Sequence, residues 1–170
     1  DRVGGLLAKQ LRRGAPDWVS IGAGLAALKD PEQRLKTLME LVAKHPADPR
    51  GRELLISLLV ESGKNKAAMQ EAERMKRDGL ASPRVMETLC DLQAEFDKVD
   101  EAKRTCSEIV EFNADDPAAR QRLGDIFLRH GWYEAAYRQY ASLAAMVGDS
   151  PFALLRLAAW QFPAPARPNR

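Results

Sequence analysis

The sequence predicts an all-α fold, an α-solenoid in which helix-turn-helix units stack one on the next. Three observations favour this fold. Prolines recur every 34 residues through most of the chain. Apolar residues keep the same phase behind each proline, at the spacing of helices that bury one face. The composition, 45% apolar but only 6% aromatic, suits helices that share a core built largely of Ala and Leu.

The helix starts follow from the repeated prolines. These are Pro49, Pro83, Pro117 and Pro151, and the residues before them are Asp48, Ser82, Asp116 and Ser150. Asp and Ser cap helices because their side chains accept hydrogen bonds from free backbone N–H groups. Proline fits the first helical position because its missing N–H would have no intrahelical partner. The pattern therefore predicts four equivalent helices, each beginning at a repeated proline.

Each unit is predicted to contain two helices of about 13 residues joined by a short turn. The turn falls at Gly63, Asp97 and Gly131, fourteen residues after the proline. The residues predicted to fill the core occupy equivalent positions in successive units: Leu55, Leu89, Leu123 and Leu157 on the first helix, with Ala68, Ala102, Ala136, Met75, Ile109 and Leu143 on the second. One hairpin cannot cover its own apolar face, so the units must stack.

The same period divides the chain into domains. The predicted units are 15–48, 49–82, 83–116 and 117–150, followed by the first helix of a further unit at 151–162. In the first unit, residues from Trp18 to Leu25 form one helix and Asp30-Pro31 opens the next. Residues 1–14 are predicted to form a partial N-terminal helix. The prolines of 163–170 predict a flexible tail.

Two stretches resemble the tetratricopeptide repeat (TPR) family. One is Trp18-x2-Ile21-Gly22-x2-Leu25, with Pro46 at the closing position; the other is Leu123-Gly124-x2-Phe127 followed by Gly131-x-Tyr133-x2-Ala136-x3-Tyr140. The resemblance covers residues 15–150 as four units, with 151–162 as the first helix of a fifth. It implies a right-handed superhelix of about four units, with partial units at both ends and a concave inner face.

The resemblance also implies which residues face a partner. The family's concave face is lined by first-helix residues that point away from the paired second helix. The matching positions are Arg50, Glu53, Ser57, Glu61, Arg84, Glu87, Thr88, Asp91, Glu95, Gln121, Arg122, Asp125 and Arg129. In the first unit they are Val19, Ser20, Ala23, Ala26 and Ala27, a flat and nearly uncharged surface. A mixed-charge binding groove and an ordinary solvated helix face both explain this set.

The predicted helix at 151–162 is apolar on nearly all sides. Its largest side chains include Phe152, Leu155, Trp160 and Phe162. A terminal repeat normally presents a polar outer face to water. We therefore expect an apolar docking end for another copy of the chain, another domain or a partner protein, which would allow a homo-oligomer. The alternative is that the fourth unit and the tail cover this helix completely.

Several classes of function are disfavoured. No catalytic residues, cofactor or metal are expected, because the chain has no CxxC motif, no His-rich cluster and no triad-like spacing. Cys90 and Cys106 are interpreted as buried thiols, with a disulfide as the alternative. The balance of 26 basic and 24 acidic residues, a net charge of +2, disfavours nucleic acid. No apolar run is long enough to span a membrane.

Aromatic residues crowd the last complete hairpin, at Trp132, Tyr133, Tyr137 and Tyr140. Their phase matches the hairpin core and turn, which favours packing over base stacking. The TPR resemblance implies a non-catalytic protein–protein interaction module, a scaffold or adaptor that binds a peptide, helix or protein partner. The alternative is a regulatory or targeting domain of a larger enzyme whose catalytic part lies outside this chain.

Overall fold

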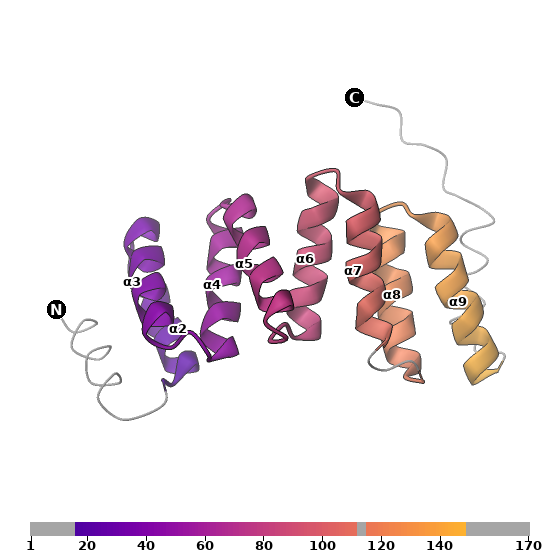
Figure 1. The fold of residues 1–170 in the computed structure, drawn as a ribbon, viewed down its shortest axis with the longest axis horizontal. Helices are drawn as coiled ribbons and strands as arrows, with labels where there is room; N and C mark the ends of the chain where they lie inside the picture. The colour runs from indigo at the N-terminus through magenta and orange to yellow at the C-terminus, as the bar shows by residue number, and fades with distance from the viewer. Residues whose placement is uncertain (1–15, 112–114, 149–170) are drawn as a thin grey trace. The chain divides into compact units, whose positions relative to one another are not determined.

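The computed structural model describes residues 16–111 and 115–148, and within them all regular structure is helical. The helices are α2 (Trp18–Ala26), α3 (Pro31–Lys44), α4 (Pro49–Glu61), α5 (Asn65–Arg77), α6 (Pro83–Glu95), α7 (Val99–Glu111), α8 (Pro117–Arg129) and α9 (Tyr133–Val147) (Figure 1). They fall into two compact units, one ending at Leu92 and one beginning at Gln93, so the division lies inside α6. The predicted all-α helical-repeat fold is confirmed.

The predicted helix starts are present wherever the structure describes them. The carboxylates of Asp30, Asp48 and Asp116 accept hydrogen bonds from the second N–H of α3, α4 and α8, at 3.0, 3.1 and 2.9 Å. Ser82 Oγ caps α6 by accepting from the N–H of Val85 at 3.3 Å. Proline stands at the first position of all four helices. Local capping chemistry therefore sets where these helices begin.

The three predicted turns share one geometry. Gly63, Asp97 and Gly131 have φ angles of 68°, 61° and 73°, in the left-handed region. After each turn an N–H bonds to a carbonyl five residues earlier: Lys64 to Leu59 at 2.8 Å, Lys98 to Gln93 at 2.8 Å and Trp132 to Phe127 at 2.9 Å. These bonds close the Schellman motif, which ends a helix. At the second of these turns the residue is Asp97 instead of glycine, and it holds a left-handed conformation that L-residues rarely adopt.

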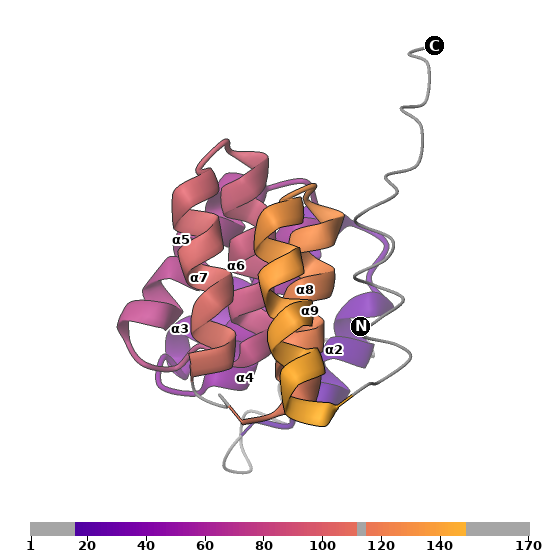
Figure 2. The same cartoon turned by 90° about the vertical axis from the view of Figure 1, so that its right-hand side faces the viewer.

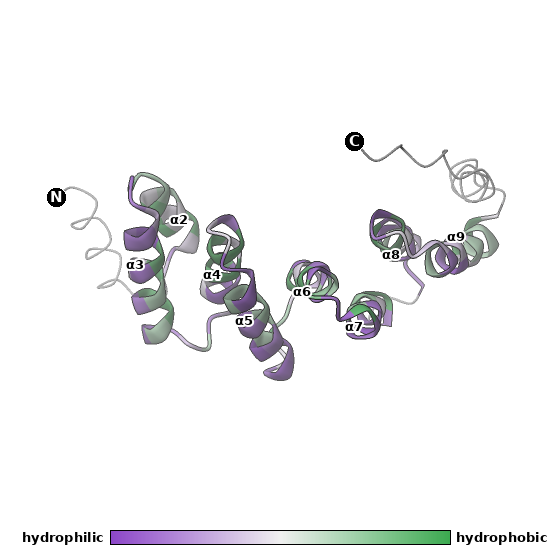
Figure 3. Cartoon of the chain, turned by 90° about the horizontal axis from the view of Figure 1, so that it is seen from above, coloured by the Kyte–Doolittle hydropathy of each residue, from purple (hydrophilic) through white to green (hydrophobic). Residues whose placement is uncertain are grey.

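The first unit has one continuous apolar core. It is built from α2 to α5 and the first part of α6, and α4 packs against α2, α3 and α5. The predicted core positions Leu55, Ala68, Met75 and Leu89 are all buried. Each helix carries both apolar and polar residues along its length (Figure 3), because only the face toward the core is apolar.

The second unit is centred on α8, which packs against α7 and lies beside α9 (Figure 2). Ala102, Ile109, Leu123, Ala136 and Leu143 are buried as predicted. The backbone of α8 approaches α9 closely at Gly124. A Cβ built there would lie 2.6 Å from Cε1 of Tyr140, so the position accepts only glycine without a shift of that ring.

The aromatic prediction for α9 is partly wrong. Tyr140 is buried as expected, and Trp132 stacks on His130 with the ring centroids 4.6 Å apart. Tyr133 and Tyr137, however, are 53% and 38% exposed. They lie one turn apart on a single stripe of α9, beside the stripe that α8 covers. The helical periodicity of the sequence predicted that both side chains face the core, whereas they lie on the neighbouring stripe of the helix.

The interpretation of the cysteines as free thiols is also wrong. Cys90 and Cys106 are both fully buried and both disulfide-bonded. The sequence showed only that both positions face inward, whereas bonding depends on the Cβ separation that packing sets.

Some predictions fall outside the described residues. These are the partial helix at 1–14, the helix at 151–162 with Phe152, Leu155, Trp160 and Phe162, the tail at 163–170, and oligomerisation through that helix.

Candidate functional site

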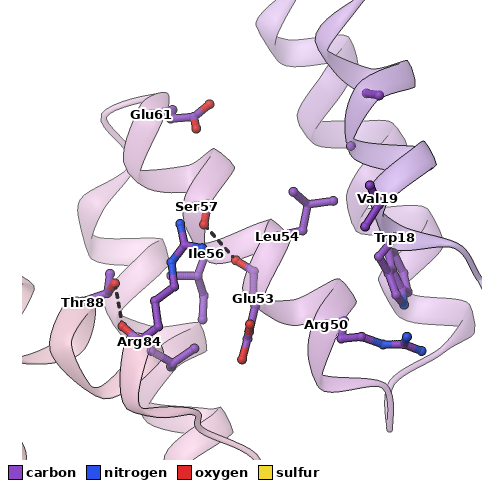
Figure 4. A pocket seen from close by; sticks show the side chains of 13 residues that line it. Trp18, Val19, Arg50, Glu53, Leu54, Ile56, Ser57, Glu61, Arg84 and Thr88 are labelled. Atoms are coloured by element: carbon purple, nitrogen blue, oxygen red, sulfur yellow. Dashed lines mark hydrogen bonds between the residues drawn. The ribbon is translucent and has the colours of Figure 1, made fainter. Parts of the chain in front are cut away.

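The first unit has a hollow of about 490 Å³ on the face formed by α2, α4 and α6. It is lined by Trp18, Val19, Gly22, Ala23, Arg50, Glu53, Leu54, Ile56, Ser57, Glu61, Arg84, Val85 and Thr88 (Figure 4). A second hollow of about 200 Å³ adjoins it between α2, α3 and α4. Gly22, Leu54, Ser57 and Glu61 line both. We call the two hollows together the α2–α4 groove.

One wall of the groove, α2, is apolar and carries no charge. The helix reads WVSIGAGLA, with its large side chains Trp18, Ile21 and Leu25 buried toward the core. Val19 remains 84% exposed and lines the groove. Beside it, Gly22 and Ala23 leave the space open. An exposed valine next to such space is a surface on which a partner can bury apolar area.

The opposite wall, on α4, is polar. Glu53, Ser57 and Glu61 follow one another at four-residue intervals, so they share one face of the helix. Ser57 Oγ donates to the carbonyl of Glu53 at 3.2 Å, which occupies the hydroxyl hydrogen. Neither glutamate forms an ion pair with any residue in 16–111 or 115–148. Both carboxylates are therefore available to a partner.

The far side of the groove comes from the start of α6. In the view of Figure 4 the Arg84 side chain lies between the levels of Glu53 and Glu61, and it lines the same hollow as Ile56 and Ser57. Its guanidinium has no carboxylate partner among the described residues. Thr88 lies one turn further along α6, and its hydroxyl donates to the carbonyl of Arg84 at 3.0 Å. A cation thus faces the space between two anions.

A hydrogen-bonded cluster closes the end of the groove near the start of α4. Asp48, the N-cap of α4, accepts from Trp18 Nε1 at 2.8 Å and from Arg50 Nε and Nη2 at 3.1 and 3.0 Å. These bonds orient the indole and neutralise the charge of Arg50. The hydrogen bond from Arg50, aided by those from Trp18 and the Arg50 backbone, lowers the pKa of Asp48 to about 2.

Trp18 is held on its other side by a close approach of α4. A Cβ built on Gly51 would lie closer than 3.0 Å to three atoms of the indole. Gly51 therefore lets the backbone of α4 approach the six-membered ring of the indole. Nothing in the sequence around Gly51 marks this position, because the Trp18 ring that requires a glycine there belongs to the preceding repeat, residues 15–48.

On the opposite edge of α4, Arg52 forms a buried ionic cluster that sequence analysis also missed. Arg52 is 4% exposed; its Nε donates to Glu71 at 2.6 Å and its Nη1 to Asp78 at 2.7 Å. Burial alone would lower the pKa of Arg52, but the bonds to Asp78 and Glu71 raise it above its usual value. This cluster ties α4 to α5 and so fixes the helix that forms the polar wall.

Six of the predicted partner-facing residues lie together around the groove: Arg50, Glu53, Ser57, Glu61, Arg84 and Thr88. Val19, Ala23 and Ala26 line it as well. The surface of the repeat 15–48 that was predicted to be flat is therefore the wall of a hollow. Gly22 has no side chain and Ala23 has only a methyl group, so the space beside Leu54 stays open and gives the hollow its depth.

The remaining predicted residues do not line the groove. Glu87 and Asp91 are half-buried on the same side of α6 as Arg84 and Thr88, but they line neither hollow. Glu95, Gln121, Arg122, Asp125 and Arg129 belong to the second unit. Among them, Asp125 accepts a hydrogen bond from the Tyr140 hydroxyl at 2.7 Å, which directs it toward its own hairpin partner.

The groove offers binding groups rather than the arrangement of a reactive centre. Its charged and hydroxyl groups are two carboxylates, three guanidiniums and two hydroxyls, with no histidine or cysteine. Among the described residues no group of three His, Cys, Asp or Glu side chains is placed to hold a metal ion. A search of the same residues found no helix long and apolar enough to cross a membrane.

No protein-family model matches the sequence. No curated protein matches it either. Solved structures do match the fold. YrrB, described as a TPR protein with an unusual peptide-binding site, has a TM-score of 0.61 at 15% identity over 94% of this chain and 82% of its own.

MamA has a TM-score of 0.60 at 13% identity, covering 84% of this chain and 78% of its own. A TPR protein from Parabacteroides merdae has a TM-score of 0.63 at 16% identity, covering 85% of this chain and 58% of its own. At these identities the similarity concerns the fold. The chain therefore has the fold of tetratricopeptide repeat proteins, as the period and the two resembling stretches predicted.

Proposed function

We propose that this protein is a protein-interaction module that binds a peptide segment of its partner in the α2–α4 groove. The observation that supports the proposal is the pairing of two unlike walls. An exposed, uncharged α2 wall faces carboxylates on α4 that have no ion-pair partner among the described residues. Apolar area supplies affinity in such a surface, and fixed charges supply selectivity.

A peptide suits this groove better than a small molecule. Sites for small molecules usually enclose most of the ligand. Here the lining includes side chains as exposed as Val19, at 84%, and Arg50, at 64%, so much of any occupant would stay in contact with water. A peptide gains affinity by distributing contacts along its length. YrrB, which shares the fold, is described as having a peptide-binding site, which is consistent with this choice.

We propose no catalysis for the module. The groove has no group that could act as a nucleophile activated by a neighbouring base. Its role would be that of a scaffold or adaptor, holding a partner by shape and by dispersed polar contacts.

The proposal is tested by closing the groove. Peptides are first selected from a random displayed library against the full chain, and their affinities are then measured by fluorescence polarisation. Ala23→Trp fills the first hollow, because Ala23 is exposed and lines it. We expect it to weaken binding by about tenfold or more, because the peptide would lose its contacts with α2.

Ala67→Trp is the matched control. Ala67 is equally a surface alanine within a helix, on α5 and away from the groove. It should leave the affinity unchanged. Peptides that bind Ala23→Trp as well as the unmodified protein would show that the α2–α4 groove is not the binding site.

A further inference from the structure

We infer that the α2–α4 groove selects an extended peptide with the order basic, apolar, acidic, apolar, basic. The inference rests on the proposed function and adds the chemistry of the partner to it. It depends on three features: which charges are unpaired, how far apart they lie, and what faces them.

In the first hollow, the charges without an ion-pair partner among the described residues alternate in sign. Asp48 neutralises Arg50 through two hydrogen bonds, so Arg50 contributes little net charge. Glu53 and Glu61 have no ion-pair partner among the described residues, and Arg84 lies between their levels without one (Figure 4). The available order along α4 is therefore negative, positive, negative. A complementary peptide presents positive, negative and positive side chains.

The spacing of the two carboxylates fits an extended chain. Glu53 and Glu61 are eight residues apart in one helix, which at about 1.5 Å per residue separates them by about 12 Å along its axis. In an extended peptide, residues i and i+4 point to the same side and lie about 13 Å apart. Two basic residues four positions apart therefore reach both glutamates, and residue i+2 points toward Arg84.

The intervening residues point the opposite way. Alternation in an extended chain turns residues i+1 and i+3 away from α4 and toward α2. There they meet Val19, Ala23 and the edge of Leu54, which form an uncharged surface. Val or another apolar residue at these two positions would cover the exposed Val19 side chain. The two walls of the groove thus match the two faces of one strand-like peptide.

Arg34 makes the two glutamates unequal. It lines the second hollow together with Glu61 and forms no ion pair within the described residues. Its positive charge weakens the attraction of Glu61 for a basic residue, whereas Glu53 lines only the first hollow. Glu53 should therefore contribute more to binding than Glu61.

The test uses labelled synthetic peptides and the full chain. The probe is Gly-Ser-Lys-Val-Asp-Val-Lys-Ser-Gly. The spacing control has the same composition but the central order Lys-Val-Asp-Lys-Val, which places the lysines three apart. We expect the probe to bind about two- to fivefold more tightly than the control, because the control can reach only one glutamate, and an exposed charge pair changes affinity by about two- to fivefold. Equal binding would overturn the inference, as would selection of peptides with basic residues eight apart, the spacing of a helix.

Matched variants test the charges directly. Glu53→Gln should weaken probe binding by about two- to fivefold, Glu61→Gln by less, and the double variant by about tenfold at low salt. Glu40→Gln removes the same charge from the exposed face of α3 and should change nothing.

The double variant Glu53→Lys, Glu61→Lys should reverse the preference and bind a peptide with the central order Glu-Val-Asp-Val-Glu more tightly than the probe. Structural damage cannot produce such a reversal, and its absence would contradict the inference. The library selection separates this inference from the proposed function. If Ala23→Trp blocks the selected peptides but they lack the predicted charge order, the groove binds peptides and only the assigned chemistry is wrong. If Ala23→Trp blocks none of them, the proposed function itself fails.

Discussion

Replacing Gly51 with alanine should destabilise the protein, although the same change in a helix normally does the opposite. Gly51 lies inside α4, where alanine would be favoured by about 1 kcal/mol from helix propensity. The added methyl group would, however, meet three atoms of the Trp18 indole at less than 3.0 Å. The ring cannot simply turn away, because Trp18 is only 6% exposed and its Nε1 bonds to Asp48 at 2.8 Å.

The magnitude follows from these competing contributions. Overpacking a core position costs about 1–3 kcal/mol. Losing the hydrogen bond between Trp18 and the Asp48 carboxylate costs about 1.5 kcal/mol more. After subtracting the gain in helix propensity, the free energy of unfolding should fall by about 1.5–3.5 kcal/mol. The shift of the indole should also change the mouth of the groove, so peptide affinity should fall together with stability.

Urea unfolding followed by far-ultraviolet circular dichroism measures the effect, since helix loss reports on the whole fold. Gly24→Ala is the control, because Gly24 lies inside α2 and a Cβ there meets nothing within 4 Å. That variant should be more stable than the unmodified protein by up to about 1 kcal/mol. If Gly51→Ala is stabilised to the same extent, the close approach between α4 and the Trp18 ring does not exist as described.

Three further predictions concern single side chains. Asp97→Gly should raise the free energy of unfolding by about 1 kcal/mol in urea titration, because Asp97 holds a φ of 61° that costs an L-residue energy and glycine little; an unchanged or lower midpoint would count against strain at this turn. Arg52→Ala should lower stability by about 2–3 kcal/mol, because it removes two charge-assisted hydrogen bonds and leaves Glu71, whose side chain is 14% exposed, with only Arg74 at 3.4 Å among the described residues; thermal unfolding that matches the unmodified protein would mean that the cluster contributes nothing. The pKa of Asp48 lies at about 2, below its usual 3.8, so its contribution of about 2 kcal/mol is complete above pH 3.8 and is lost as the pH falls through 2. Acid titration of stability should show that loss in the unmodified protein and not in Asp48→Asn, and identical titrations would refute the assignment.

Local chemistry made much of the fold predictable. An Asp or Ser followed by Pro begins a helix at Pro31, Pro49, Pro83 and Pro117, because the capping bond and the fixed φ of proline involve only neighbouring residues. The partner-facing positions Glu53, Ser57 and Glu61 were implied by the TPR resemblance, and their four-residue spacing then places them on one face of the helix. Repetition then strengthened each local signal, since Leu55, Leu89 and Leu123 occupy one equivalent position and are all buried.

What the sequence did not predict depends on contacts between residues far apart in the chain. Gly51 is an ordinary helix position until the Trp18 ring of the preceding unit is placed against it. Arg52 has the sequence signature of a surface residue, and only the positions of Glu71 and Asp78 explain its burial. The depth of the groove depends on Gly22 and Ala23 lying beside Leu54. Periodicity identifies the face of a helix but not the shape of the gap between two faces.

The shared use of Asp48 divides the groove lining into two kinds of residue. Trp18 and Arg50 are bound to the same carboxylate that begins α4, so replacing either would loosen a helix. The side chains of Val19, Glu53 and Arg84 are not bound to this carboxylate and do not hold the start of α4 in place. A chain that acquires a new partner through mutation can therefore vary these three positions at little risk to folding, and an engineer who wishes to redirect the module should begin with them.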